Sequence, residues 1–102
     1  MYYTRGMAIE LTESAAKRGY ALDDAVYAMS NPYVVEPEFE ASRIPGGARP
    51  TLWLGPSRDA LNPVLEILAE VIPPDTIRIF HMMPIRQRIR EEYREDLPEE
   101  YR

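Results

Sequence analysis

The stretch of sequence that decides the fold is residues 76–93, which read Thr-Ile-Arg-Ile-Phe-His-Met-Met-Pro-Ile-Arg-Gln-Arg-Ile-Arg-Glu-Glu-Tyr. The alternating residue types in its first half predict a strand over residues 76–82. In such a strand Ile77, Ile79 and His81, the only histidine of the chain, would share one face of a sheet. The stretch therefore predicts a buried strand that carries the single imidazole.

The second half of this stretch predicts a helix that begins near Pro84, because proline suits the first turn of a helix. Ile85, Ile89 and Tyr93 recur every four residues and would pack on the sheet. Another face of the same helix carries arginines at the same spacing, namely Arg86, Arg90 and Arg94. The chain thus predicts a group of guanidinium side chains just beyond the end of the strand.

Two helices are predicted near the start of the chain. Thr12 can cap a helix over residues 13–18, and Gly19 would end it in the left-handed conformation. A second helix begins at two acidic residues, 23 and 24, which suit the positive end of the helix dipole, and stops at Asn31-Pro32.

Strands are predicted at residues 33–36, 51–54 and 76–82. Residues 64–72 are ambiguous, because their apolar residues fit both the alternation of a half-buried strand and the spacing of a helix. With this segment as a strand, the order of elements is α-α-β-β-β-β-α. This order predicts an α+β fold with two N-terminal helices, a four-stranded antiparallel sheet and a C-terminal helix, with the helices on one side.

The 102 residues predict one domain spanning residues 1–102, with its core over about residues 8–93. Residues 94–102 are rich in acidic residues and predict a flexible tail. The sequence contains no cysteine, which excludes thiolate metal sites and cysteine nucleophiles. No segment is apolar for long enough to predict a transmembrane helix or a signal peptide, so a cytoplasmic protein is expected.

The formal net charge of −5 argues against an electrostatic grip of the whole protein on nucleic acid. The distribution of charge is uneven, however, because arginines gather between Arg78 and Arg94. The sequence therefore predicts one local basic face on an acidic protein.

Four segments carry a resemblance to a known family: residues 11–19 (Leu-Thr-Glu-Ser-Ala-Ala-Lys-Arg-Gly), 22–32, 52–58 (Leu-Trp-Leu-Gly-Pro-Ser-Arg) and 79–86 (Ile-Phe-His-Met-Met-Pro-Ile-Arg). They resemble the toxins of bacterial type II toxin–antitoxin systems, specifically the BrnT-like branch of the RelE/ParE superfamily. The last segment is similar to a His-Ala-Met-Pro-Leu-Arg box found in a subgroup of these proteins. In these relatives the part that matches residues 65–71 is a strand, which favours the strand for the ambiguous segment.

The resemblance implies a toxin that inhibits translation by cutting RNA without a metal or another cofactor. Its substrate would be mRNA, either free or on the ribosome, and no membrane would be involved. A cognate antitoxin protein would neutralise it by contacting the basic helix and the edge of the sheet.

Metal-independent RNA cleavage needs a base for the 2′-hydroxyl, an acid for the leaving 5′-oxygen and a cation for the phosphate. His81 is the candidate base or acid, because imidazole changes its protonation near neutral pH. Arg86 is the candidate catalytic cation, since guanidinium matches phosphate geometry. The candidate RNA-binding residues are also basic: Lys17, Arg18, Arg58 and Arg90. No metal site is predicted.

Each of these residues also has a structural interpretation. His81 could be a packed core histidine, the arginine stripe a solvated helix face, and Arg58 a simple turn residue. Two further hypotheses about function therefore stay open: a non-catalytic toxin-fold module that binds a protein, and an oligomer, such as a homodimer, that forms through the edge of the third strand.

Overall fold

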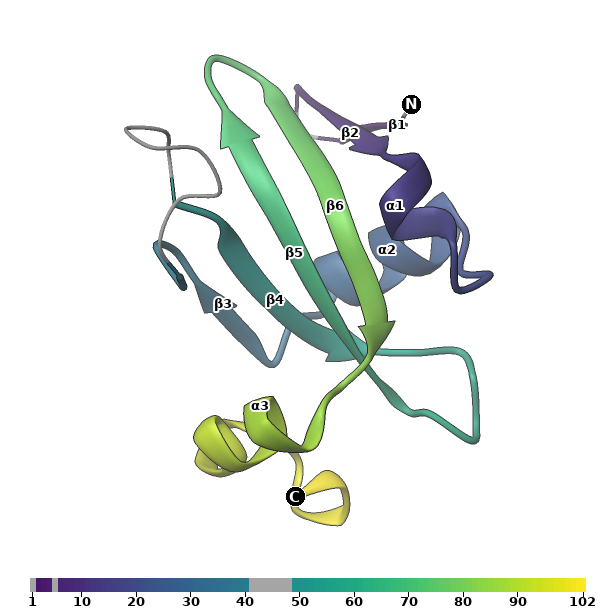
Figure 1. Ribbon diagram of the computed structural model, residues 1–102, viewed down its shortest axis with the longest axis vertical. Helices are drawn as coiled ribbons and strands as arrows, with labels where there is room; N and C mark the ends of the chain where they lie inside the picture. The colour runs from purple at the N-terminus through teal and green to yellow at the C-terminus, as the bar shows by residue number, and fades with distance from the viewer. Residues whose placement is uncertain (1, 5, 41–48) are drawn as a thin grey trace.

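The computed structural model describes residues 2–4, 6–40 and 49–102 (Figure 1). The strands are β1 (Tyr2–Thr4), β2 (Met7–Leu11), β3 (Val34–Glu36), β4 (Thr51–Pro56), β5 (Val64–Ile72) and β6 (Thr76–Pro84). The helices are α1 (Glu13–Ala16), α2 (Leu22–Ser30), α3 (Gln87–Glu92) and the 3-10 turns η1 (Arg94–Asp96) and η2 (Glu99–Tyr101). No helix in the described ranges has the length and apolar character needed to cross a membrane.

The described strands form one sheet in the order β1-β2-β6-β5-β4-β3. The expectation of a four-stranded antiparallel sheet is wrong, because β1 and β2 add an N-terminal hairpin and β2 pairs with β6 in parallel. The segment of residues 7–11 is too short for its pattern to predict a strand. In the structure, however, Ala8 and Ile9 are buried, and Glu10 forms an ion pair with Arg78 at 3.0 Å. The sheet is therefore mixed, and the first strand of the core lies upstream of the first helix.

The N-terminal helix begins as the sequence predicts. The Thr12 hydroxyl accepts a hydrogen bond from the Ala15 amide at 3.2 Å, and Gly19 leaves the helical region with φ of 88°. The backbone amide of Thr12 also donates to the Ile79 carbonyl at 3.0 Å, which holds the start of α1 beside β6. The cap thus fixes where β2 ends and where the chain leaves the sheet.

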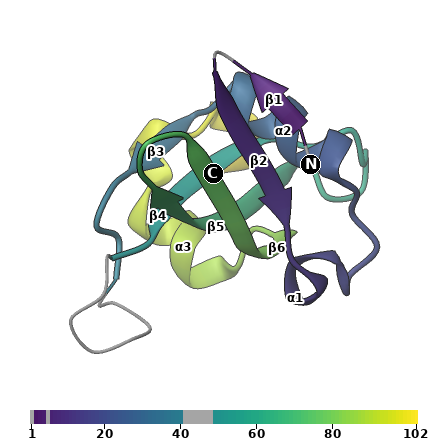
Figure 2. The same ribbon diagram turned by 90° about the horizontal axis from the view of Figure 1, so that it is seen from above.

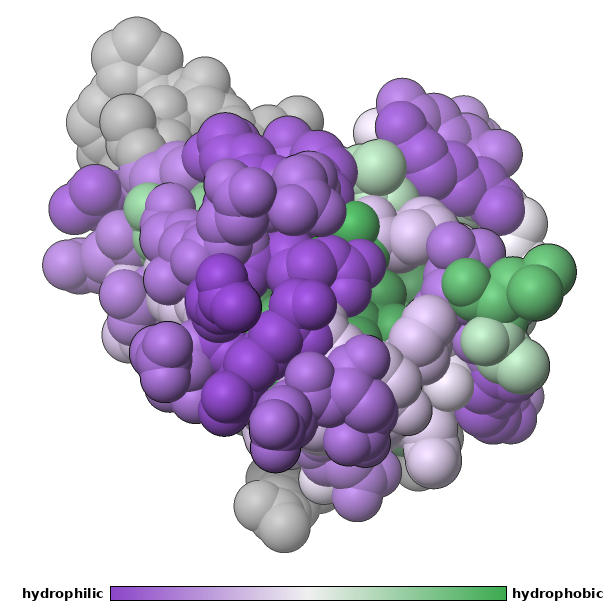
Figure 3. All heavy atoms as spheres, turned by 90° about the horizontal axis from the view of Figure 1, so that it is seen from below, coloured by the Kyte–Doolittle hydropathy of each residue, from purple (hydrophilic) through white to green (hydrophobic). Residues whose placement is uncertain are grey.

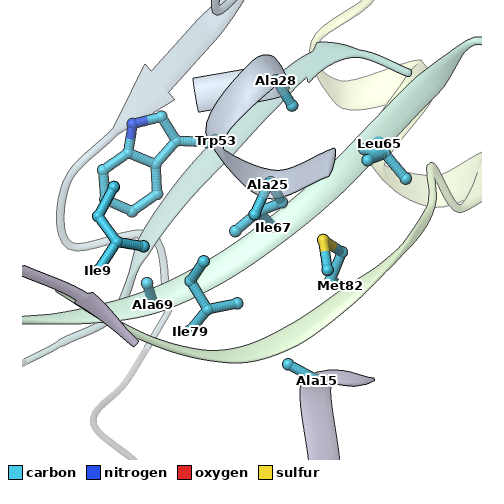
Figure 4. Close-up of a cluster of buried hydrophobic side chains, with 10 residues drawn as sticks. All are labelled: Ile9, Ala15, Ala25, Ala28, Trp53, Leu65, Ile67, Ala69, Ile79 and Met82. Atoms are coloured by element: carbon cyan, nitrogen blue, oxygen red, sulfur yellow. The ribbon is translucent and has the colours of Figure 1, made fainter. Parts of the chain in front are cut away.

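Helices cover both faces of the sheet, so the prediction that they lie on one side is wrong. Figure 2 shows α2 and α3 on opposite sides of the central strands. One core cluster joins α1 and α2 to the sheet: Ile9, Ala15, Ala25, Ala28, Trp53, Leu65, Ile67, Ala69, Ile79 and Met82 (Figure 4). A second cluster lies on the face under α3: Leu52, Leu54, Val64, Leu68, Ile85, Ile89 and Leu97. Two separate cores explain why β5, in the middle, is buried on both faces and forms a strand.

An irregularity in β6 changes the direction of His81. Leu68 of β5 lies opposite His81, but the next residue, Ala69, lies opposite Ile79, so Phe80 is an extra residue in β6. Such a bulge interrupts the alternation of side chains, since residues paired across strands share a face. His81 therefore lies with Leu68 on the α3 side, whereas Ile79 lies with Ala69 on the α2 side. The prediction that His81 shares a face with Ile77 and Ile79 is wrong.

The close approach of α2 to β4 yields a test of the packing. A Cβ atom on Gly55 would overlap the backbone carbonyl of Ala28, so we expect Gly55→Ala to lower the free energy of unfolding by about 3 kcal/mol. The control is Gly19→Ala, where the added Cβ meets open space and only the positive φ is strained. We expect Gly19→Ala to lower the free energy of unfolding by about 1 kcal/mol. Urea denaturation of both variants measures the difference, and equal losses would contradict the packing described for α2.

Candidate functional site

The side chain at the centre of the candidate site is Glu66, near the start of β5. It lies between Leu65 and Ile67, opposite Leu54 of β4 and Met83 of β6, and its side chain is 0% exposed. An isolated carboxylate in such a place would be strongly destabilising, so it must be paired and hydrogen-bonded. The fold must therefore place partners for the Glu66 carboxylate next to it.

Two basic side chains meet at Glu66. The Nε2 atom of His81 lies 2.7 Å from its Oε2 atom, and the Nε and Nη2 atoms of Arg86 lie 2.7 Å from the same oxygen. The backbone amide of Arg86 donates to Oε1 at 3.1 Å. Both oxygens of the carboxylate are thus satisfied, and no buried side-chain polar atom in the described ranges lacks a hydrogen-bond partner.

The local structure explains why these residues converge. The bulge at Phe80 turns the His81 side chain onto the face that Glu66 occupies. Arg86 follows the end of β6 and precedes α3 with an extended backbone (φ −77°, ψ 151°), so its amide is not used within the helix. The Ile85 amide donates to the Val64 carbonyl at 3.0 Å and holds this corner against β5.

The charge state of Glu66 follows from competing effects. Burial raises the pKa of the Glu66 carboxyl, whereas hydrogen bonds from His81 and from the Arg86 side chain and amide, together with the Arg86 charge, lower it. The lowering effects win, and the pKa of Glu66 lies below its ordinary value of 4.5. Glu66 is therefore a carboxylate at neutral pH.

The two basic groups reach the surface although their shared acceptor does not. The side chain of His81 is 21% exposed and that of Arg86 is 36% exposed. A group that can exchange protons and a permanent cation are thus held side by side at a surface, on a rigid buried anchor. This arrangement can serve acid–base chemistry next to a bound anion.

The predicted residues Lys17, Arg18 and Arg58 lie on connections near the end of the sheet where β4 and β6 finish and β5 begins. Lys17 and Arg18 are exposed after α1, and Arg58 follows β4. The Tyr20 hydroxyl donates to Asp59 Oδ2 at 3.4 Å and thereby joins the α1–α2 connection to the β4–β5 loop. Figure 3 shows hydrophobic atoms in a hollow between that projecting loop and the hydrophilic side formed by α3 and the C-terminal segment.

Arg58 is already engaged within the chain. Its Nη2 atom lies 3.0 Å from Asp24 Oδ1, and its guanidinium carbon lies 6.0 Å from the centre of the Tyr27 ring. Both contacts are with α2, on the opposite face of the sheet from Arg86. The structure therefore does not place Arg58 in contact with the Glu66 cluster.

Arg90 also has a hydrogen-bond partner within the chain. Its Nη1 atom donates to the Tyr101 carbonyl at 2.6 Å. Residues 94–102, predicted to be a flexible tail, form η1 and η2 and return over α3, with Leu97 buried in the core under that helix. Of the six predicted site residues, only His81 and Arg86 contact Glu66.

Glu66 is the residue of the site that the sequence pattern did not predict. A usable signal was present, because a lone carboxylate interrupts the apolar run Val-Leu-Glu-Ile-Leu at residues 64–68. In a strand covered on both faces such a carboxylate needs a cationic partner, and the chain offers a histidine and several arginines just downstream. Metal binding is a separate matter: the described ranges contain no group of three or more histidine or acidic side chains that could hold an ion.

No family model matches this chain, no curated protein matches it significantly, and no solved structure matches it significantly.

The buried carboxylate predicts a specific dependence of stability on pH. Because the pKa of Glu66 is lower in the folded state than its ordinary 4.5, its contribution to stability is present above that pH and is lost as the pH falls. We expect Glu66→Gln to be about 3 kcal/mol less stable at pH 7 and to lose less stability on acidification than the original chain. Urea denaturation between pH 7 and pH 3 measures this, with Glu13→Gln, at an exposed position of α1, as the control. Parallel curves for the Glu66 variant and the original chain would contradict the ion-pair assignment.

Proposed function

We propose that this chain is a metal-independent endoribonuclease of the BrnT-like toxin type, which inhibits translation in the cytoplasm and is neutralised by a cognate antitoxin protein. The observation that carries the proposal is the contact of His81 and Arg86 with one oxygen of Glu66. It puts a proton-exchanging group and a cation next to each other on the partly exposed side of a buried anchor.

The proposed chemistry uses His81 first as a base and then as an acid, and it uses Arg86 as the cation. His81 takes the proton of a ribose 2′-hydroxyl, and the 2′-oxygen attacks the adjacent phosphorus. The O2′–P bond forms and the P–O5′ bond breaks, which leaves a 2′,3′-cyclic phosphate and a 5′-hydroxyl. The proton held by His81 returns through a water molecule to the 5′-oxygen. Arg86 stabilises the negative charge that gathers on the phosphate oxygens.

Exposed cations around the end of the sheet support binding of a polyanion. Lys17 and Arg18 are exposed on a connection that Tyr20 ties to the β4–β5 loop. Cations of this kind contribute to affinity through release of counterions from the nucleic acid, and their effect weakens with salt. They would guide RNA to the chemical groups without contacting the scissile phosphate.

The proposal predicts a growth defect and its relief. Expression of the intact chain without a partner is expected to arrest bacterial growth, and the purified chain is expected to cleave RNA in the presence of a metal chelator. His81→Gln keeps a hydrogen-bond donor for Glu66 but cannot exchange protons, so we expect cleavage to fall by about 10²-fold or more. Arg86→Lys keeps the charge but loses the planar contact of the guanidinium, so we expect RNA cleavage to fall in this variant as well.

The control for this experiment is Arg88→Ala, because Arg88 lies on the same helix but pairs with Glu40 at 3.5 Å. It should retain both growth arrest and cleavage. Circular dichroism of all variants separates loss of fold from loss of activity. Harmless expression of the intact chain, combined with absence of cleavage in vitro, would count decisively against a ribonuclease.

A second candidate function is a protein-binding module that uses the same fold without chemistry. The specific observation that favours it is the engagement of Arg58 with Asp24 and of Arg90 with the Tyr101 carbonyl, which leaves these two cations fewer donors for phosphate. This alternative predicts a stable complex with the cognate antitoxin and no RNA cleavage at any protein concentration. Cleavage by the purified chain that is lost in His81→Gln would exclude it.

A further inference from the structure

The hydrogen bonds of Glu66 restrict where His81 can carry its proton. The Arg86 amide, Nε and Nη2 groups can only donate, so the oxygens of Glu66 act as acceptors toward all three. The permanent charge of Arg86 at 2.7 Å favours the carboxylate over the neutral acid. A carboxylate also cannot donate to His81, so the Nε2 atom of the imidazole must be the donor in the 2.7 Å contact.

We propose that Glu66 is a positioning residue that holds a proton on Nε2 of His81 and so makes Nδ1 the nitrogen that exchanges protons with the substrate. In neutral imidazole only one nitrogen carries hydrogen, and a hydrogen bond to one nitrogen decides the state of the other. The role in catalysis rests on the ribonuclease function proposed above. The position of the proton rests only on the geometry of Glu66, His81 and Arg86.

The proton balance of the reaction is then assigned to single atoms. Nδ1 takes the proton from the 2′-hydroxyl, and the resulting imidazolium keeps its Nε2 proton toward Glu66. Two charged groups face this cation: Glu66 from β5, which stabilises it, and Arg86 from the start of α3, which opposes it. When Nδ1 gives its proton back through water to the 5′-oxygen, the starting tautomer is restored. The reaction needs no oxidant or reductant.

The same contacts limit which donors of Arg86 can face a ligand. Nε and one N–H of Nη2 are used by Glu66, so Nη1 and the second N–H of Nη2 are left for an anion. The site therefore offers Nδ1 of the imidazole and the outer end of the guanidinium to the substrate. This set of groups suits a hydroxyl next to a phosphate, as in a ribose 2′-hydroxyl and its adjoining phosphodiester.

The test is nitrogen NMR of the full chain labelled with ¹⁵N-histidine, in which His81 is the only histidine and gives the only imidazole signals. At a pH where the ring is neutral, Nε2 is expected to show the resonance of a protonated nitrogen and Nδ1 that of an unprotonated one. A proton on Nδ1, or a rapid average over both nitrogens, would overturn the proposal. This measurement needs only the original chain, so it stands even where a variant does not fold.

The second arm uses Glu66→Gln, whose amide can accept or donate and so no longer selects one tautomer. We expect mixed nitrogen resonances and a fall in RNA cleavage of about 10²-fold. Glu70→Gln, the same change on the same strand opposite Arg78, should alter neither. An unchanged spectrum and rate in Glu66→Gln would overturn the positioning role. Absence of cleavage by the original chain, with the proton on Nε2, would instead overturn the ribonuclease and leave the tautomer assignment standing.

Discussion

The structure depends on one constraint: a carboxylate placed in the middle of the sheet has to be neutralised by groups from elsewhere in the chain. Glu66 has a fully buried side chain, and its contacts join β5 to β6 through His81 and to the start of α3 through Arg86. Removing one member of such a buried pair typically costs several kcal/mol, because the remaining charge is left without compensation. The pair therefore fixes one register of β6 and one entry point for α3.

This constraint links the chemistry to irregular features of the fold. A regular β6 would direct His81 to the α2 side, away from Glu66, and the extra residue Phe80 prevents this. A helix that began one turn earlier would use the Arg86 amide internally, whereas the extended backbone at Arg86 releases it to Oε1. Both departures from regular structure bring a partner to the same carboxylate.

The sequence predicts the features that arise from neighbouring residues. The capped start of α1, the strand that carries His81 and the presence of a helix after it follow from local propensity and spacing. The predicted start of that helix near Pro84 is wrong, because Pro84 ends β6 and α3 begins at Gln87. The parallel pairing of β2 with β6, the bulge at Phe80 and the placement of α3 on the other face depend on contacts between residues far apart in the chain. Proximity of His81 and Arg86 could be expected from their spacing, but their common acceptor could not.

Under the proposed ribonuclease function, the ion pair also limits how the site would attract RNA. The charge of Arg86 is balanced by Glu66, so the pair presents little net positive charge, and the chain as a whole carries −5. Attraction would then come from exposed cations at the end of the sheet, such as Lys17 and Arg18, whose effect acts at longer range and is screened by salt. The proposed function thus divides binding and chemistry between different residues, and a protein partner that covered the exposed cations would block access without disturbing the buried cluster.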